Sequence, residues 1–471
     1  MSATAPSERT PFGRVRALLA ESQRGITDVL LMLVPQFVIV LTGFLTTVLI
    51  ARGLGPASLG QYSLVISVAG LTAAFSDMGI GQTAIRYASR AAAEGRTDEQ
   101  MAVLRWALRL RLMLVSGLAV TVALLAPVIA GRCWHSPALG PLIRLGLLGG
   151  AFAALASVPA VYFQSIRGFG RNATIQIGQA LLALSGVLLV AALRWWSVKT
   201  IVVVGVVAAA VGAVVFLPMV PRAALFATRR RGGAATTRRG FWTSPITPEP
   251  GLSGLVDSGP GTFAMYNVIS TLIVMVTLRL DVWLMGAFGR PEQIGLYTVA
   301  SRFALPLGLM LAAVGGALWP RASARTDPRA ALVLLRRTFQ LSIPLGLLAI
   351  VYALAVPLLT PLLFGSAYQG SRLLGQVLCI RYALAILIVP VGVVGYSLGF
   401  VRVYWIINLV QLVAVAIVNV MLLPRIGPMA SALALVVSEV IGVTLAGGLL
   451  LRRARQIDRD ARTGDPGGVS G

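Results

Sequence analysis

Residues 49–86 of the chain read LIARGLGPASLGQYSLVISVAGLTAAFSDMGIGQTAIR. One apolar segment ends near Arg52, a glycine-rich stretch that contains Gly60 follows, and a second apolar segment begins at Tyr62. Glycine adopts backbone angles that other residues avoid, so the stretch predicts a tight turn between two helices. The second of these helices carries an acidic residue, Asp77.

The composition around this stretch is that of a membrane protein. Of 471 residues, 57% are hydrophobic and 12% are charged, and the mean hydropathy is +0.84. Soluble domains contain about 25% charged residues. A helix needs about 20 apolar residues to cross a bilayer. Runs of this kind lie at residues 29–50, 62–84, 112–130, 141–163, 173–193, 200–220, 263–288, 294–318, 339–363, 373–397, 403–423 and 429–451. We therefore predict an all-α polytopic membrane protein with about twelve transmembrane helices.

The net charge of +24 comes almost entirely from arginine, with Lys199 as the one lysine. In a soluble protein such a charge would suggest nucleic acid, but these arginines lie between apolar segments, so we expect no nucleic-acid partner. With the N-terminus in the cytoplasm, 29 basic residues fall in cytoplasmic segments and eight in external ones. Positive charge is enriched on the cytoplasmic side of membrane proteins, so both termini are predicted to be cytoplasmic.

An internal repeat divides the chain. Three pairs of segments match at offsets of 235, 234 and 231 residues: Gly60–Tyr62 with Gly295–Tyr297, Leu125–Pro127 with Leu359–Pro361, and Gly168–Arg171 with Gly399–Arg402. Six predicted spans separate equivalent positions, an even number, so the halves are parallel repeats related by an axis along the membrane normal. This arrangement is typical of transporters that work by alternating access. A duplicated structural protein that transports nothing is the alternative.

The repeat predicts two six-helix bundles, residues 29–221 and 263–451. Residues 222–262 between them are rich in glycine, proline and arginine and are interpreted as a basic cytoplasmic linker. Residues 1–28 and 452–471 are predicted to be a cytoplasmic N-terminal segment and a cytoplasmic tail.

Several motifs resemble a known family. They are Ala51–Leu64, Ser76–Arg86, Asp281–Gly289 followed by Gly295–Tyr297, Leu362–Gly365 and Leu423–Gly427. In order and spacing they resemble polysaccharide and lipid-linked oligosaccharide flippases of the multidrug/oligosaccharidyl-lipid/polysaccharide (MOP) exporter superfamily, over roughly residues 25–451. The resemblance implies a MATE-like fold in the bacterial cytoplasmic membrane. It also implies a lipid-linked oligosaccharide as substrate and, as partners, the bilayer and polymerases or glycosyltransferases of the same pathway.

Four arginines at or inside the predicted spans are candidate ligands of the substrate: Arg52, Arg279, Arg302 and Arg381. Charge inside a membrane is costly and therefore indicates function by default. Guanidinium binds phosphate through two hydrogen bonds and stays charged when desolvated, which suits a polyprenyl diphosphate. A structural role competes at each position: interfacial anchoring for Arg52, and an Asp281–Arg302 pair that locks two spans together.

Three acids, Asp77, Asp281 and Glu439, are candidates for ion coupling or for structural pairing. Arg279 and Asp281 are two residues apart, about 200° around a helix, so the two are predicted to face different directions. Gly79 and Gly81 follow Asp77 and are predicted to let the helix bend, while Gly60 and Gly295 are predicted turn glycines.

These observations favour a flippase for an anionic lipid-linked oligosaccharide, driven by an ion gradient or the membrane potential, for exopolysaccharide, capsule or O-antigen assembly. A multidrug or cation antiporter of the same superfamily is the first alternative, and it needs acids in its cavity. An integral-membrane glycosyltransferase or ligase is the second, although the external loops carry only Glu292 and His135 for catalysis. We predict no enzyme activity, no cofactor and no metal site.

Overall fold

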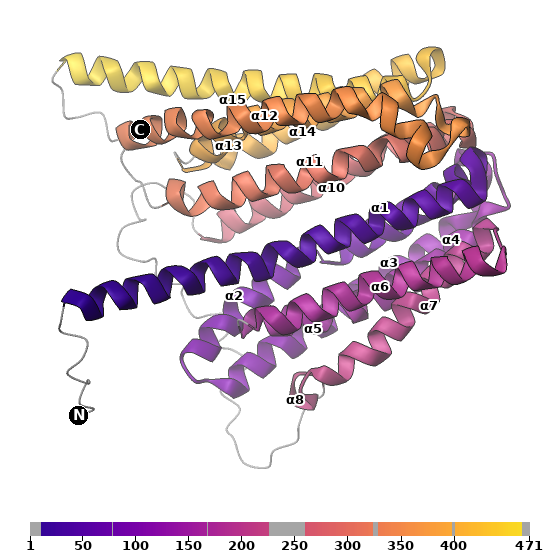
Figure 1. The fold of residues 1–471 in the computed structure, drawn as a ribbon, viewed down its shortest axis with the longest axis horizontal. Helices are drawn as coiled ribbons and strands as arrows, with labels where there is room; N and C mark the ends of the chain where they lie inside the picture. Colours follow the sequence, from indigo (N-terminus) through magenta and orange to yellow (C-terminus); the bar gives the residue numbers. More distant parts are fainter. Residues whose placement is uncertain are drawn as a thin grey trace.

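The computed structural model describes residues 11–77, 79–166, 168–225, 260–323, 328–397 and 401–463, and this part of the chain is helical throughout, without strands. Figure 1 shows two helical bundles side by side, one from α1–α8 and one from α10–α15. Helix α1 begins and helix α15 ends at the same end of the molecule, which we call the near end. The opposite end is called the far end.

The first bundle contains seven longer helices. They are α1 (Pro11–Asp77), α2 (Ile80–Ala93), α3 (Thr97–Val128), α4 (Leu139–Ala156), α5 (Val158–Ser165), α6 (Phe169–Leu193) and α7 (Val198–Phe216). A π-helical turn, Ile129–Cys133, extends α3, and the short helix α8 (Arg222–Leu225) follows a 3₁₀ turn at Leu217–Met219.

The second bundle contains six helices. They are α10 (Pro260–Phe288), α11 (Pro291–Ser323), α12 (Pro328–Phe364), α13 (Ser371–Ser397), α14 (Val401–Ile426) and α15 (Met429–Thr463). A 3₁₀ turn, Ser366–Tyr368, joins α12 to α13. The predicted linker at 222–262 lies mostly outside the described residues, as do parts of the predicted N-terminal segment and tail.

Helix α1 is folded back on itself at Gly55. This glycine has φ 76° and ψ 172°, angles that non-glycine residues avoid. Eleven helices in the described part of the chain are long and apolar enough to cross a membrane, and the first, Val34–Phe75, has 42 residues. At about 1.5 Å per residue it is roughly twice as long as a bilayer core is thick. Residues 29–50 and 62–77 therefore form two arms, in agreement with the two spans predicted there.

The glycines of the opening stretch differ from prediction. Gly60 lies inside the second arm, and its counterpart Gly295 lies inside α11, so neither is a turn glycine. The bend is at Gly55 instead. The predicted span 62–84 is also too long, because α1 ends at Asp77 and Gly79 takes left-handed angles, φ 80°, before α2 begins.

Gly60 and Gly295 let the two bundles cross closely. A methyl group on Gly60 would lie 1.7 Å from the carbonyl oxygen of Pro291, and one on Gly295 would lie 2.0 Å from that of Pro56. Pro56 and Gly60 are each 235 residues before Pro291 and Gly295. The two contacts are therefore equivalent under the repeat, and the second arm of α1 crosses α11 on a pseudo-twofold axis.

Hydrogen bonds mark the same axis. The hydroxyls of Thr298 and Ser63 are hydrogen-bonded at 2.8 Å, and these residues are again 235 apart. One turn further along α1, the indole nitrogen of Trp283 donates to Ser67 at 3.0 Å. The repeat inferred from Gly60–Tyr62 and Gly295–Tyr297 thus appears in the structure as a symmetric seam between the bundles.

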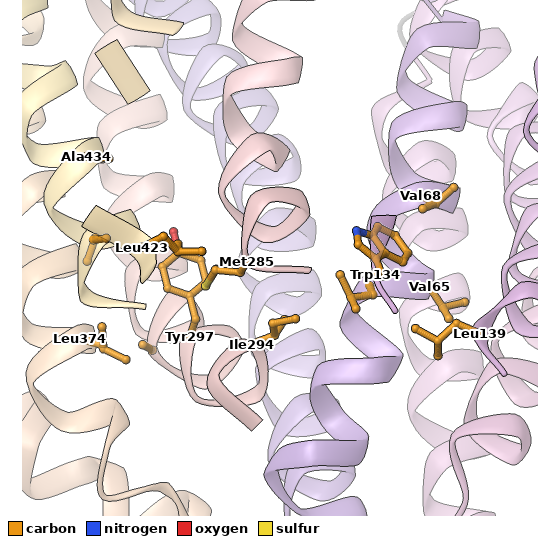
Figure 2. Packing of buried hydrophobic residues seen from close by; sticks show 14 of the residues in the cluster. Val65, Val68, Trp134, Leu139, Met285, Ile294, Tyr297, Leu374, Leu423 and Ala434 are labelled. Atoms are coloured by element: carbon orange, nitrogen blue, oxygen red, sulfur yellow. The ribbon is translucent and has the colours of Figure 1, made fainter. Parts of the chain in front are cut away.

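A buried apolar cluster extends across this seam. In Figure 2, Trp134 lies beside Val65 and Val68 of α1, while Met285 and Tyr297 lie together near Leu423 of the second bundle. Between helices in a bilayer such packing stabilises through van der Waals contact, because lipid tails are as apolar as these side chains. Because this cluster draws residues from both halves, the bundles are packed as one unit where they cross.

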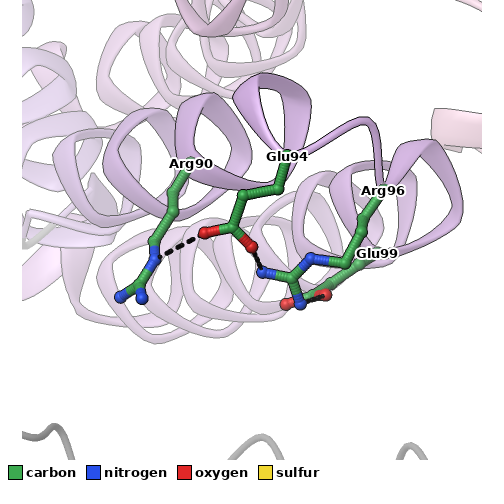
Figure 3. A network of polar contacts seen from close by, with 4 residues as sticks. All are labelled: Arg90, Glu94, Arg96 and Glu99. Carbon is green, nitrogen blue, oxygen red and sulfur yellow. Dashed lines mark hydrogen bonds and ion pairs between the residues drawn. The ribbon is translucent and has the colours of Figure 1, made fainter. Parts of the chain in front are cut away.

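A polar network closes the turn between α2 and α3 at the near end. Glu94 accepts hydrogen bonds from Arg90 and Arg96, and Arg96 also donates to Glu99 (Figure 3). The face of α2 that contacts the bundle consists of small apolar residues such as Ala84 and Ala88, both fully buried. Helix α2 is therefore amphipathic and lies against the bundle rather than continuing the span.

Candidate cavity site

A cavity of about 260 Å³ lies between the two arms of α1, helix α6 and helix α11. Its wall is rich in hydroxyl groups and contains one charged side chain. The lining residues are Ile39, Thr42, Gly43, Thr46, Thr47, Ile50, Leu59, Tyr62, Ala180, Ala183, Thr298 and Arg302. Residues from both sides of the Gly55 bend line the same space, so the fold-back of α1 creates the cavity.

Arg302 enters this cavity from the second bundle. Its Nε atom is buried, and within the described residues it has no hydrogen-bond partner. Tyr62 and Arg279 lie close enough to interact with its charge, and neither supplies a negative group. A buried cation is unfavourable unless an anion or several acceptors compensate it. The cavity is therefore suited to an anionic ligand.

Two of the threonines in the wall already use their hydroxyl protons within the first arm of α1. Thr42 donates to the carbonyl of Val38 at 2.7 Å, and Thr47 donates to that of Gly43 at 2.9 Å. These bonds fix each hydroxyl against its own helix, because a threonine can donate to the carbonyl one turn earlier. The lining groups left to donate to an anion are therefore those of Arg302, Thr46 and Tyr62.

Asp281 does not pair with Arg302, so that predicted pair is wrong. The Asp281 side chain, 4% exposed, accepts hydrogen bonds from the hydroxyl of Tyr297 and from the backbone nitrogen of Val282, the latter at 2.7 Å. Tyr297 and Arg302 are five residues apart on α11, about 140° around the helix. Arg302 can therefore face the first bundle while Tyr297 faces the interior of the second.

Arg279 and Asp281 face different directions, as predicted. Arg279 is exposed and Asp281 is buried. The guanidinium of Arg279 lies beside Gly70 on the second arm of α1, 3.5 Å from the position of a methyl group there. Arg279 therefore lies at the seam between the bundles and is not among the residues that line the cavity.

Arg381 and Glu439 form an ion pair of 3.3 Å inside the second bundle. Their side chains are 18% and 21% exposed. The guanidinium also lies 4.9 Å from the centre of the Tyr382 ring. The sequence predicts Arg381 as a cavity arginine and Glu439 as a coupling acid, independently of each other. In the structure the two are partners, and the pair joins α13 to α15.

Asp77 pairs with Arg111 of α3 at 3.5 Å. Its carboxylate also lies against Gly81, where a methyl group would be 3.2 Å from Oδ1. Asp77 is therefore located at the junction of α1, α2 and α3, toward the near end and away from the cavity.

Arg52 lies at the far end, where it binds backbone carbonyls of α12. Of the four candidate arginines, only Arg302 lines the cavity. Sequence reasoning missed Tyr62 and the threonines, which supply most of the polar wall. The recurrence of Tyr62 as Tyr297 marks both as equivalent positions of the repeat, but it does not indicate which of them faces the cavity.

Known proteins share this fold. Residues 26–242 match the family of polysaccharide biosynthesis proteins. No curated protein matches the chain in sequence. The lipid II flippase MurJ in an inward closed conformation superposes with a TM-score of 0.65 at 14% identity, over 91% of this chain and 87% of that one. An inward-facing multidrug resistance MATE family transporter of the MOP superfamily has a TM-score of 0.61 at 14% identity, over 92% and 99%.

A third similar structure is a MOP superfamily transporter from Pyrococcus furiosus, with a TM-score of 0.58 at 12% identity, over 90% of this chain and 95% of that one. The family match and the shared fold confirm the resemblance that the sequence motifs predict. The all-α MATE-like architecture is confirmed with it.

Proposed function

We infer that this chain is a flippase-type membrane transporter of the MOP superfamily. We propose that it translocates an anionic polyprenyl-diphosphate-linked oligosaccharide for polysaccharide assembly. The observation that carries the proposal is Arg302, a half-buried arginine that lines the cavity and whose buried Nε atom lacks a partner among the described residues. The lipid-linked glycan supplies the phosphate groups that such a site needs.

The chemistry of guanidinium supports phosphate as the group bound at Arg302. Its planar donors match phosphate oxygens in pairs, and its charge persists after desolvation. Hydroxyl groups of Thr46 and Tyr62 line the same wall and provide further donors for phosphate oxygens. A cavity of about 260 Å³ suits the diphosphate, and the glycan and lipid tail would extend beyond it.

The charge of the cavity disfavours a cation antiporter. A cationic drug requires acids in its binding site, whereas no described acid lines this cavity. The three candidate acids lie elsewhere: Asp281 against Tyr297, Glu439 against Arg381 and Asp77 against Arg111. Coupling to an ion gradient is assigned in this proposal to Asp281 or to the Arg381–Glu439 pair. Neither Asp281 nor the Arg381–Glu439 pair is among the residues that line the cavity at Arg302.

The proposed orientation places the near end in the cytoplasm, in agreement with the excess of arginine in the segments between spans. In this orientation the cavity accepts the lipid-linked glycan after its assembly on the cytoplasmic leaflet. Glycosyltransferases would then act before the flippase, and a polymerase would act after it.

The test is a flipping assay in vesicles that contain the purified protein and a fluorescent polyprenyl-diphosphate-linked oligosaccharide. A membrane-impermeant reductant bleaches the label on the outer leaflet, so transfer between leaflets appears as additional bleaching. Replacing Arg302 with Gln should slow transfer by roughly tenfold to hundredfold, the effect of losing hydrogen bonds from a charged group. Arg302→Lys should recover only part of the rate, because lysine keeps the charge but lacks the planar donors.

Arg290→Gln is the matched control, since Arg290 is an exposed arginine in the turn between α10 and α11 and does not line the cavity. It should transfer the lipid at the wild-type rate. Wild-type transfer by Arg302→Gln would contradict the phosphate assignment. Transport of cationic dyes without any transfer of the lipid would favour the antiporter instead.

A further inference from the structure

A pair of charge-assisted hydrogen bonds joins the two bundles at the far end. Arg52 donates from Nε to the carbonyl of Leu363 and from Nη2 to that of Leu362, both at 2.8 Å. Helix α12 ends at Phe364, so these carbonyls belong to its last turn and have no partner within the helix. The last turn of a helix also carries partial negative charge. The guanidinium therefore caps α12 from the opposite bundle.

Tyr368 makes a second bond at the same place. It lies in the turn after α12 and donates its hydroxyl to the carbonyl of Ala51 at 2.8 Å, while its side chain is 1% exposed. Phe364 packs edge-on against both Tyr368 and Phe44. The end of the first arm of α1 is thus attached to the corner between α12 and α13 by polar bonds and by an aromatic stack.

The other side of the pseudo-twofold axis lacks these polar bonds. By the offset of 235 residues, the counterpart of Arg52 is Ala287, which has no donor group. There Trp134 packs against Gly286, where a methyl group would lie 2.5 Å from the indole nitrogen. One side of the seam is therefore held by hydrogen bonds from Arg52, and the equivalent side is held by apolar packing.

We propose that Arg52 and Tyr368 form a latch that keeps the far end closed over the cavity, and that opening of the far end begins with release of the α12–α13 corner from α1. The cavity starts at Ile50, two residues before Arg52, so separation at this corner opens a path to it. Arg52 therefore acts in closure, whereas Arg302 acts in binding. The proposal requires no assumption about the substrate.

Accessibility of the cavity from the far end tests the latch. A single cysteine at Thr46, which lines the cavity, serves as the probe in a background without the native thiols (Cys133→Ser and Cys379→Ala). Labelling by a membrane-impermeant maleimide is measured in right-side-out and inside-out vesicles, so that each end is sampled separately. Arg52→Ala and Tyr368→Phe should each raise the labelling rate from the far end by about tenfold, and the double variant should raise it further.

Two controls separate opening from misfolding. Arg425→Ala removes an exposed arginine at the same end and should leave labelling unchanged. A disulfide between cysteines at Ser63 and Thr298, whose hydroxyls are 2.8 Å apart, fixes the crossing of the bundles. In the Arg52→Ala variant this disulfide should return far-end labelling to the wild-type rate. Labelling of a misfolded protein would not respond to the disulfide.

The proposal is overturned if Arg52→Ala, Tyr368→Phe and the double variant all label from the far end at the wild-type rate. It is also overturned if Arg425→Ala has the same effect as Arg52→Ala. Loss of lipid transfer in Arg52→Ala with unchanged labelling would assign Arg52 to the substrate instead.

Discussion

Replacing Gly60 with Ala should separate the two bundles at their crossing. The new methyl group would lie 1.7 Å from the carbonyl oxygen of Pro291, whereas ordinary contacts of this kind begin near 3.4 Å. The backbones must therefore move apart by about 1.7 Å, the difference between these two distances. Overpacking of this kind costs about 1–3 kcal/mol, and here both obstructing elements are backbone, which cannot rotate away.

The substitution has an opposing effect on the helix itself. Alanine favours a helix by about 1 kcal/mol relative to glycine, so the measured cost of Gly60→Ala is smaller than the cost of the clash. Gly117→Ala measures the gain in helix propensity alone, because Gly117 lies in α3 with no heavy atom within 4 Å of the new methyl group. The difference in unfolding free energy between the two variants, about 1–3 kcal/mol, is therefore the cost of the clash alone.

The assay is unfolding of the purified protein in detergent, followed by tryptophan fluorescence, together with lipid transfer in vesicles. Gly117→Ala should be as stable as wild type or slightly more stable. Gly60→Ala should be less stable than Gly117→Ala and should transfer lipid more slowly, because the seam no longer closes. Equal stability of the two alanine variants would refute the close crossing on which the pseudo-twofold axis rests.

Three smaller effects follow from other contacts. Gly55→Ala forces a side chain onto φ 76° and ψ 172°, and should destabilise the fold by about 1–3 kcal/mol in the same unfolding assay. Glu439→Gln leaves Arg381 without its 3.3 Å partner, and should cost about 1–3 kcal/mol, which Arg381→Met in the same chain should partly restore. The hydrogen bond from Arg90 holds the pKa of Glu94 below its ordinary value of 4.5. The hydrogen bond therefore stabilises the fold above pH 4.5, and this stabilisation is lost as the pH falls through the lowered pKa of Glu94. Glu94→Gln should remove this dependence of stability on acid pH.

The sequence predicts the architecture well because its signals are local or periodic. Apolar runs locate the spans, and the offset of 235 residues locates the repeat. The exact bend is less predictable: Gly55 and Gly60 are both glycines of the same stretch, and only their backbone angles show that Gly55 turns while Gly60 allows a close crossing.

The site is only partly predictable for a related reason. The sequence identifies Arg302 as a candidate because a charge inside a membrane is unfavourable. The direction of its side chain, however, depends on how α11 is rotated between the bundles. That rotation places Tyr297 on Asp281 and leaves Arg302 in the cavity, which the sequence does not show. Arg381 and Glu439 are 58 residues apart, and no local pattern indicates that they pair.

The symmetric crossing at Gly60 and Gly295 also describes how the chain assembles. Each bundle presents the same proline–glycine surface to the other, which is the geometry of an isologous homodimer interface joined into one polypeptide. Subunits that recognise each other through such a surface do not require a covalent connection to associate. The two bundles, produced as separate polypeptides in one membrane, are therefore expected to assemble into a heterodimer through the surface that now holds the single chain together.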